Sequence, residues 1–416
     1  MKRREFMTLI GGAAIGGAAA GGLAWPFAAG AQQPSGQIDG ALRKAVEDKA
    51  IPGVVAMATN RRRTLYQGAF GVADVATGRA LTADALFRIA SMTKAITTTA
   101  AMQLLEQGRF GLDDPVEKYL PAFARLQVFE SLDGATGAYR LRPATRIATV
   151  RHLMTHTSGL GYPFTSATVR DFKPRAGEDY PVGPLLFEPG ERWHYGTSTD
   201  WLGKLVEAVS GRPLDEYFRL RVLEPLGMSD TFYNVPADKQ ARLVAVHHRD
   251  ADGTIVKDAT QPPATVNPIG GGGLSSTASD YIRFVRMILN DGELDGVRIL
   301  KADTIEAMAR NQIGAIGVPA LKTALPQRSD DFSFIADGRD KWGLGFLITV
   351  DQVAGKRSAG SLSWGGIYNT YFWIDRTSGV AGVILFTQFL PFADRKALAV
   401  YDTFECGVYQ LADAVR

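Results

Sequence analysis

The feature that most constrains this chain is the tetrapeptide Ser91-Met92-Thr93-Lys94, which lies between a strand-like run at 85–90 and a helix-forming run at 95–105. Residues three apart are neighbours on a helix surface, so this spacing predicts a serine hydroxyl beside a lysine amine. Serine needs a base before it attacks a carbonyl, and lysine serves as one only when burial or nearby charge lowers its usual pKa of about 10.4. The tetrapeptide therefore indicates a nucleophile beside a base. The alternative is a serine that caps a helix and a solvated lysine.

Composition narrows the class of protein. The chain has 416 residues, of which 46% are hydrophobic and 21% charged, as in soluble globular proteins with an ample core. This length suits either two or three domains or one large enzyme. The net charge of +3 is too small for the basic stripe of a nucleic-acid-binding protein or for a polybasic membrane anchor. The basic run at 61–63 separates two apolar alternating segments and predicts a solvated hairpin turn.

The amino-terminal segment has the pattern of an export signal. Lys2-Arg3-Arg4 precedes a Gly/Ala-rich apolar stretch, and Ala29-Gly30-Ala31 forms a small-residue cleavage site. Adjacent arginines followed by Phe6 are similar to the twin-arginine signal of bacteria. A retained membrane anchor is the alternative, which several glycines and Pro26 disfavour. We therefore expect cleavage of residues 1–31 and a mature domain, 32–416, that is periplasmic or secreted and not bound to a membrane.

Cysteine and histidine usage predicts neither a disulfide nor a metal site. Cys406 is the single cysteine, and we expect it to be a buried small apolar residue of a C-terminal helix. His152 and His156 have helical i, i+4 spacing, but the glutamate of a zinc-binding H-E-x-x-H is missing. We expect the protein to use no metal and no organic cofactor.

The order of apolar patterns predicts the architecture. Helical or strand-like periodicity occurs in these segments: helix at 38–47, hairpin at 54–70, helices at 150–155, 202–209, 214–223 and 277–289, strands at 343–350, 371–374 and 380–387, and helix at 395–412. Ser276 or Thr277 is expected to cap the helix at 277–289. Strands at both chain ends predict an α+β, or α/β, fold whose antiparallel sheet is built from about 32–90 and 275–416. An all-helical subdomain, about 91–274, would be inserted. The turn-rich segment 313–334 is either a lid over a pocket or a surface loop.

Further motifs accompany the tetrapeptide in a recognisable order. They are Leu153-Met154-Thr155-His156-Thr157-Ser158-Gly159-Leu160, Phe187-Glu188-Pro189-Gly190, Tyr195, the run 203–211, Glu224-Pro225-Leu226-Gly227-Met228, the run 270–275 and Trp364-Gly365-Gly366. In order and spacing, from about Ile51 to Gln388, the chain resembles the serine β-lactamase and penicillin-binding-protein-like superfamily, specifically its class-C-like esterase branch. The resemblance implies a serine β-lactamase-like fold with helices flanking the sheet.

The resemblance also implies residue roles. Ser91 would be the acylated nucleophile with Lys94 beside it, and Tyr195 would be the general base or its proton relay with Lys94. Trp364-Gly365-Gly366 would be the third motif, usually K-T-G or H-T-G, on a strand that walls the site. The oxyanion hole would consist of the backbone N–H groups of Ser91 and Ile367. A buried core position is the alternative for Tyr195.

Two departures from the superfamily pattern favour esters. Tyr195-Gly196-Thr197 replaces the usual Y-x-N, so the amide that would bind an acylamino side chain is absent. Trp364 replaces the cation or histidine that would engage a β-lactam carboxylate, and leaving a carboxylate unpaired costs several kcal/mol. The W-G-G motif resembles that of esterases and transesterases with neutral acyl substrates, for which an indole offers apolar surface and one donor.

The expected function is an exported serine hydrolase, an esterase or transesterase, that acts on a small-molecule ester and binds no nucleic acid. One alternative is a β-lactamase or D-amino-acid-peptide hydrolase, and another is a non-catalytic cell-envelope binding protein. We expect a structural role for His156 and core positions for Trp342 and Trp373. Gly270 to Gly273 lacks the Gly-Lys-Ser/Thr of a phosphate-binding loop and predicts close backbone packing near the site. The sequence leaves the acyl and alcohol groups and the oligomeric state open.

Overall fold

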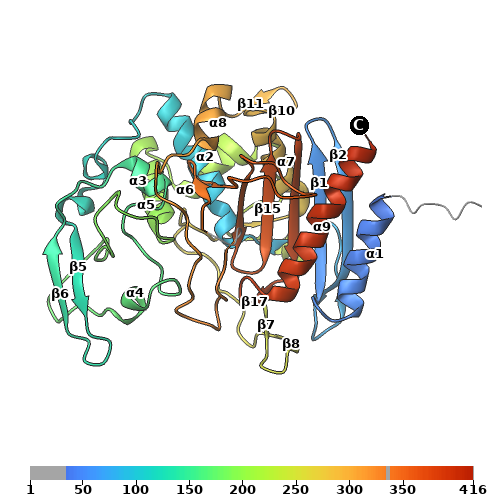
Figure 1. Cartoon of the computed structure of the whole chain (residues 1–416), viewed down its shortest axis with the longest axis horizontal. Helices are drawn as coiled ribbons and strands as arrows, with labels where there is room; N and C mark the ends of the chain where they lie inside the picture. The colour runs from blue at the N-terminus through green and yellow to red at the C-terminus, as the bar shows by residue number, and fades with distance from the viewer. Residues whose placement is uncertain (1–33, 334–337, 416) are drawn as a thin grey trace, which may run out of the picture. The chain divides into compact units, whose positions relative to one another are not determined.

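An antiparallel sheet forms the centre of the molecule in the computed structural model, which describes residues 34–333 and 338–415 (Figure 1). The expected export signal lies outside these residues. Among the described strands, eight form this sheet in the order β12-β13-β14-β15-β16-β1-β2-β3. They are β1 (Gly53–Asn60), β2 (Thr64–Asp74), β3 (Arg79–Ala80), β12 (Lys341–Trp342), β13 (Leu347–Ile348), β14 (Leu362–Gly366), β15 (Thr370–Asp375) and β16 (Val380–Phe386).

The pairing of β1 with β16 joins the two ends of the chain. Their register runs from Val54 opposite Phe386 to Asn60 opposite Val380. The prediction of one antiparallel sheet built from both chain ends is therefore confirmed. The strand expected over 343–350 is reduced to β13, because Gly345 has a left-handed backbone (φ 84°) and packs against Thr98.

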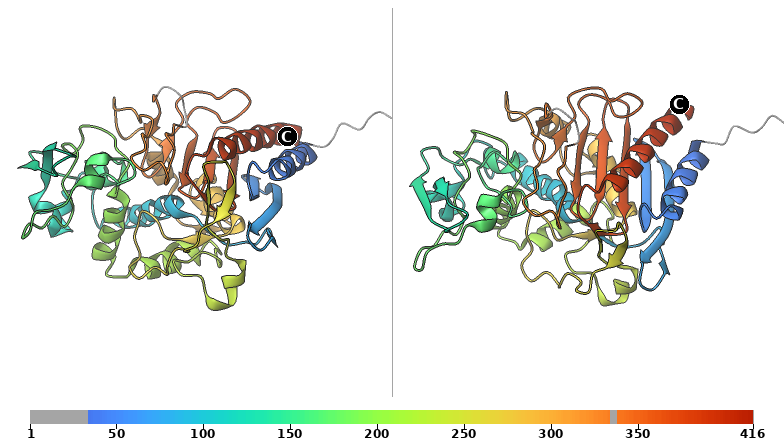
Figure 2. Two further views of the ribbon diagram at one scale, coloured as in Figure 1. Left: turned by 90° about the horizontal axis from the view of Figure 1, so that it is seen from below. Right: turned by 60° about the horizontal axis from the view of Figure 1, so that its bottom comes forward.

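Two helices from opposite chain ends cover one face of the sheet. α1 (Pro34–Glu47) and α9 (Arg395–Ala414) lie side by side over this face (Figures 1 and 2) and share one apolar core with buried residues such as Trp373. Cys406 of α9 is half-buried and not buried as predicted, because its position lies between the buried stripe and the exposed face.

The opposite face carries α7 (Ala278–Leu289), which packs on β1 and β16. The side chain of Thr277 accepts a hydrogen bond from the Asp280 N–H, so Thr277 is the cap of this helix. α2 (Thr93–Glu106) is buried along almost its whole length and packs against α5 (Ser198–Ser210). The second core cluster unites these helices with this face of the sheet.

The inserted region is not all-helical, so that prediction is wrong. Its helices besides α2 and α5 are α3 (Val150–Met154), α4 (Ala167–Asp171) and α6 (Leu214–Phe218), and its strands are β5 (Gln127–Leu132), β6 (Tyr139–Pro143), β7 (His247–Arg249) and β8 (Ile255–Lys257). Sequence patterns missed the β5–β6 hairpin because these strands are largely solvent-facing and bury few side chains, among them Val128 and Tyr139. The remaining elements are β4 (Phe87–Arg88), β9 (Ser275–Ser276), β10 (Glu293–Leu294), β11 (Val297–Arg298), α8 (Ala302–Ala309) and β17 (Phe389–Leu390).

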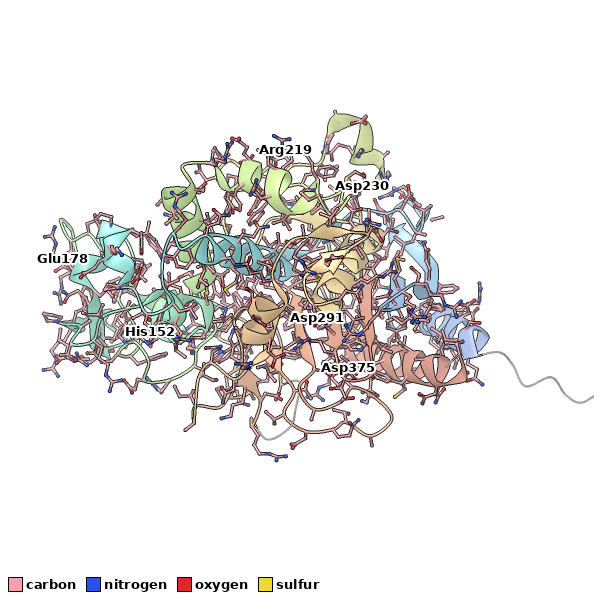
Figure 3. All side chains as sticks on the ribbon, turned by 90° about the horizontal axis from the view of Figure 1, so that it is seen from above. His152, Glu178, Arg219, Asp230, Asp291 and Asp375 are labelled. Atoms are coloured by element: carbon pink, nitrogen blue, oxygen red, sulfur yellow. The ribbon has the colours of Figure 1, made fainter. Side chains whose placement is uncertain are left out.

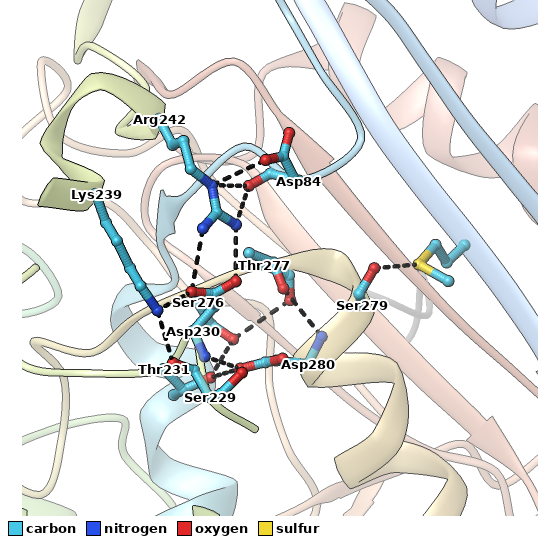
Figure 4. A network of polar contacts seen from close by, with 11 residues as sticks. Asp84, Ser229, Asp230, Thr231, Lys239, Arg242, Ser276, Thr277, Ser279 and Asp280 are labelled. Atoms are coloured by element: carbon cyan, nitrogen blue, oxygen red, sulfur yellow. Dashed lines mark hydrogen bonds and ion pairs between the residues drawn. The ribbon is translucent and has the colours of Figure 1, made fainter. Parts of the chain in front are cut away.

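A polar network fastens the segment before β7 to the start of α7 (Figure 4). The Asp280 carboxylate accepts hydrogen bonds from the Asp230 N–H at 2.7 Å and the Thr231 hydroxyl at 2.8 Å. Asp230 in turn pairs with Lys239 at 2.6 Å and Arg242 at 2.8 Å. Burial raises the pKa of Asp280, and the hydrogen bonds from the Thr231 hydroxyl and the Asp230 N–H offset part of that rise.

None of the helices in the described ranges has both the length and the apolar character of a membrane-spanning helix.

Buried polar contacts attach α9 to the sheet and its loops. The Arg357 guanidinium makes a bidentate contact with Glu405 of α9 at 2.7 and 2.8 Å, and both side chains are buried. The Tyr409 hydroxyl donates to Asp375 at 2.9 Å, and Figure 3 shows Asp375 beside α9. Docking of α9 therefore depends on matched charges as well as on apolar area.

We predict that Glu405→Gln lowers the free energy of unfolding by about 3 kcal/mol, because it leaves the buried Arg357 charge uncompensated. Urea denaturation measures this change. Glu293→Gln, which alters the exposed pair with Arg298, is the control and should have no measurable effect. Equal effects of the two substitutions would contradict the prediction.

Candidate active site

Ser91 lies at a sharp bend between β4 and α2. It occupies a single 3-10 turn, Ala90–Met92, directly before the first residue of α2. Ala90 has a φ of 44°, a conformation that is uncommon for a residue with a side chain. The strand-to-helix junction expected around this serine is therefore confirmed. The helix N-terminus directs partial positive charge toward Ser91.

The third motif runs along this bend on β14. A Cβ atom at Gly366 would overlap the carbonyl oxygen of Ile89 and the hydroxyl of Thr370, so only glycine lets the strand approach so closely. Ile367 follows β14 directly, and Ser91 and Ile367 line the same cavity. The two residues expected to form an oxyanion hole thus line one cavity, and their role there stays a prediction.

Lys94 is buried beside Ser91. Only 2% of its surface is exposed, and its Nζ lies 3.2 Å from Ser91 Oγ, 3.2 Å from the Tyr162 hydroxyl and 2.6 Å from the Gly271 carbonyl oxygen. The alternative of a solvated lysine is therefore wrong. The serine and the amine have the contact that their spacing predicts.

Tyr195 is the third predicted residue of the site. The Lys94 Nζ lies 4.8 Å from the centre of its ring, and Tyr195 lines the cavity together with Ser91. The Tyr195 hydroxyl accepts a hydrogen bond from Trp364 Nε1 at 3.4 Å. The structure therefore brings Ser91, Lys94 and Tyr195 together, but the phenol hydrogen-bonded to Lys94 belongs to Tyr162.

An aromatic cluster holds the Tyr195 ring. Trp364 lies 4.9 Å from it between ring centres, His156 lies 5.0 Å away and Trp193 is stacked at 6.4 Å. Burial, together with the charge of Lys94, lowers the pKa of His156 well below its usual value, so this imidazole is neutral at pH 7. His156 packs within the cluster, as expected for a structural residue, and Trp342 is fully buried beside it.

Tyr162 and Asp200 are the functional candidates that sequence reasoning missed. The Tyr162 hydroxyl donates to Asp200 Oδ2 at 3.2 Å, and the Gly271 N–H donates to Asp200 Oδ1 at 2.7 Å. Because Lys94 contacts both Tyr162 and the Gly271 carbonyl, the four residues form a closed ring of hydrogen bonds. Burial raises the pKa of Asp200, an effect opposed by the charge of Lys94, and burial together with the Asp200 charge raises the pKa of Tyr162 well above its usual value.

The cavity above Ser91 is mostly apolar. Its empty space, part of it open to solvent, amounts to about 460 Å³. Its lining residues are Ser91, Phe164, Thr165, Tyr195, Leu321, Lys322, Ser329, Asp330, Phe332, Trp364, Gly365, Ile367 and Phe392. Leu321, Lys322, Ser329, Asp330 and Phe332 belong to the turn-rich segment expected over 313–334, of which the structure describes residues 313–333. This described part lines the pocket and is not merely a surface loop, and its role as a lid stays a prediction. Trp364 was predicted to face the substrate; only 5% of it is exposed, and most of its indole packs in the aromatic cluster.

His152 serves a local structural purpose. Its Nδ1 accepts a hydrogen bond from the Thr149 N–H at 3.1 Å, which completes the capping of α3. Figure 3 shows His152 toward the β5–β6 end of the molecule, far from Asp375. Within residues 34–333 and 338–415, no three His, Cys, Asp or Glu side chains are grouped so as to hold a metal ion.

Comparisons with known proteins cover nearly the whole described chain. The Beta-lactamase family model matches residues 38–404. Monacolin J acid methylbutanoyltransferase of Aspergillus terreus is 31% identical over 411 residues, which cover 92% of this chain and 97% of that protein. Lovastatin esterase of Penicillium rubens is 30% identical over 397 residues, with coverages of 90% and 98%. The solved structure of a simvastatin synthase (LovD) mutant from Aspergillus terreus superposes with a TM-score of 0.79 at 30% identity, covering 92% of this chain and 98% of that one.

The side chain of His194 contacts Thr165, one of the residues that line the cavity. Its Nε2 lies 3.2 Å from the Thr165 hydroxyl, which donates to the Tyr195 carbonyl oxygen at 2.9 Å. Burial lowers the pKa of His194 to about 4. The unfolded chain, with a histidine pKa of about 6.5, binds this proton more readily between pH 4 and 6.5. Stability therefore falls as pH decreases through that window.

Lowering the pH from about 7.5 to about 5 should reduce the free energy of unfolding of the wild type by about 2 kcal/mol more than that of His194→Gln. Glutamine keeps a polar partner for Thr165 but cannot titrate. Chemical denaturation at the two pH values measures the difference. Identical losses in both proteins would show that His194 does not titrate as described.

Proposed function

Because the chain belongs to the Beta-lactamase family, we propose that it is a serine hydrolase that cleaves or transfers carboxylic esters through an acyl-enzyme at Ser91. The observation that carries this proposal is the 3.2 Å contact between Ser91 Oγ and the buried Lys94 amine beneath an apolar cavity. Two of the relatives are named as a methylbutanoyltransferase and as a lovastatin esterase, and these names support ester chemistry. Membership of this family and the contact between Ser91 and Lys94 thus support one reaction class.

The proposed reaction has two halves. In the first, Ser91 Oγ attacks the ester carbonyl carbon while its proton passes to the Lys94–Tyr195 pair, and the N–H groups of Ser91 and Ile367 stabilise the oxyanion. The carbon–oxygen bond to the alcohol then breaks, and the alcohol leaves with the transferred proton. In the second half, water or another alcohol attacks the acyl-enzyme in the same way and releases an acid or a new ester. Hydrolysis and transfer differ only in this second nucleophile.

The cavity lining supports a neutral acyl group. Phe164, Leu321, Phe332 and Phe392 provide apolar walls around the serine. Lys322 also lines the cavity, but its ammonium is exposed and pairs with Asp331 at 2.7 Å, so it is not a buried cation dedicated to a substrate carboxylate. An uncharged ester therefore fits these walls better than a β-lactam or a D-amino-acid peptide, whose carboxylate would require a dedicated cation.

Export is a separate part of the proposal. The twin-arginine pattern at Arg3-Arg4 and the small-residue site at Ala29-Gly30-Ala31 support delivery of residues 32–416 to the periplasm or the exterior of a bacterial cell. The catalytic proposal does not depend on it.

We predict that Ser91→Ala abolishes hydrolysis of a short p-nitrophenyl ester. Lys94→Ala and Tyr195→Phe should each lower kcat by about a hundredfold or more, because each removes a proton-transfer group. Steady-state kinetics with parallel thermal unfolding measures both. Tyr217→Phe is the matched control, since Tyr217 is buried but does not line the cavity. Undiminished turnover by Ser91→Ala would refute the nucleophile, and wild-type turnover by Lys94→Ala or Tyr195→Phe would refute that residue's role.

Side-by-side assays of neutral esters and nitrocefin test the substrate class. We expect kcat/KM for the best ester to exceed that for nitrocefin by about a hundredfold or more, because the cavity leaves a β-lactam carboxylate unpaired. Comparable values would favour a β-lactamase. A folded protein that turned over neither substrate and formed no covalent adduct would favour a non-catalytic binding protein.

A further inference from the structure

The hydrogen bonds of Lys94 leave its amine only one direction in which to act. Its Nζ has three bonding positions besides the side-chain carbon. The Gly271 carbonyl oxygen at 2.6 Å can only accept, so one position is an N–H donated to it. Because the Tyr162 hydroxyl gives its proton to Asp200, it accepts a second N–H from Lys94. The third position is the one that faces Ser91 Oγ, at 3.2 Å.

The glycine at 271 allows this arrangement. A Cβ atom there would overlap Asp200 Oδ1 and would come within 2.7 Å of the Tyr162 hydroxyl. At Gly270, a Cβ atom would overlap the Thr199 carbonyl oxygen. Gly270 and Gly271 therefore pack closely against the backbone and side chains of α5, which confirms the close backbone packing expected for the run 270–273. The first turn of α5 thus brings Asp200 into contact with the N–H of Gly271, the residue whose carbonyl oxygen binds Lys94.

We propose that Asp200 is a positioning residue: through Tyr162 and the backbone of Gly271, it orients the Lys94 amine so that its remaining bonding position is directed at Ser91. The inference rests on the proposed acyl-enzyme chemistry at Ser91 and goes further by assigning a residue that does not contact the substrate. Its carboxylate has two oxygens, and each accepts from one arm of the ring. Loss of either arm frees Lys94 to rotate away from the serine. A misplacement of about 1 Å in a catalytic group costs about a hundredfold in rate.

Asp200→Asn is the most direct test. Asparagine has nearly the same shape but offers one carbonyl oxygen and one NH₂ group, so it cannot accept from both the Gly271 N–H and the Tyr162 hydroxyl. The readout is the rate of Ser91 labelling by a fluorophosphonate probe, followed by mass spectrometry of the labelled peptide. We expect the first-order labelling rate at saturating probe to fall about 10- to 100-fold. The probe concentration for half-saturation should change little, because Asp200 does not line the cavity.

Coupling between the two arms separates positioning from simple damage. Tyr162→Phe should also slow labelling, and the double variant Tyr162→Phe/Asp200→Asn should be no slower than the slower single variant, because both act through one ring. Asp280→Asn is the matched control: it alters another buried carboxylate that accepts from an N–H and a hydroxyl, in the network of Figure 4. It should label at the wild-type rate even if its melting temperature falls.

Each outcome is decisive. Wild-type labelling of folded Asp200→Asn, additive losses in the double variant, or a change confined to half-saturation would overturn the positioning role while leaving the acyl-enzyme proposal intact. If Asp200→Asn does not fold, Tyr162→Phe decides the question, since wild-type labelling by that variant would also overturn the role. Absence of label on Ser91 in the wild type would refute the proposed function and this inference together.

Discussion

The buried amine of Lys94 is the interaction on which the rest of the site depends. A lysine with 2% of its surface exposed must find polar partners inside the protein, because desolvation without them costs several kcal/mol. One partner, Ser91, lies one turn before Lys94, and the other two come from distant segments: Tyr162 after α3 and Gly271 before β9. Satisfying one buried lysine thus requires three separate segments of the inserted region, about 91–274, to pack together correctly.

Close backbone approach makes that convergence possible. Gly366 lets β14 lie against the bend that holds Ser91, and Gly271 lets its peptide contact Asp200. Ala90 has an unusual φ at that bend, and the next residue, Ser91, lines the cavity. Strain and missing side chains at these positions cost stability, and the extensive apolar cores on both faces of the sheet offset that cost.

Contacts between residues close in sequence could be predicted from the sequence, whereas contacts made only by tertiary packing could not. The Ser91–Lys94 contact is local to one helical turn, so their spacing alone indicated it, and Tyr195 was found because it belongs to a motif. Tyr162 and Asp200 meet Lys94 only through tertiary packing, and neither lies in a pattern that marks it. The β5–β6 hairpin was missed because its strands bury too few side chains to create an alternating signal. Trp364 was placed at the correct wall, but its burial against Tyr195 depends on neighbours that no local pattern specifies.

Direct trapping of the covalent intermediate tests the central claim most sharply. The wild-type protein would be mixed with a p-nitrophenyl ester, quenched in acid within the first turnover and digested for peptide mass mapping. We expect one acyl group per chain, carried by Ser91. An acyl group on any other residue, or steady ester turnover with no acylated chain at any quench time, would contradict it.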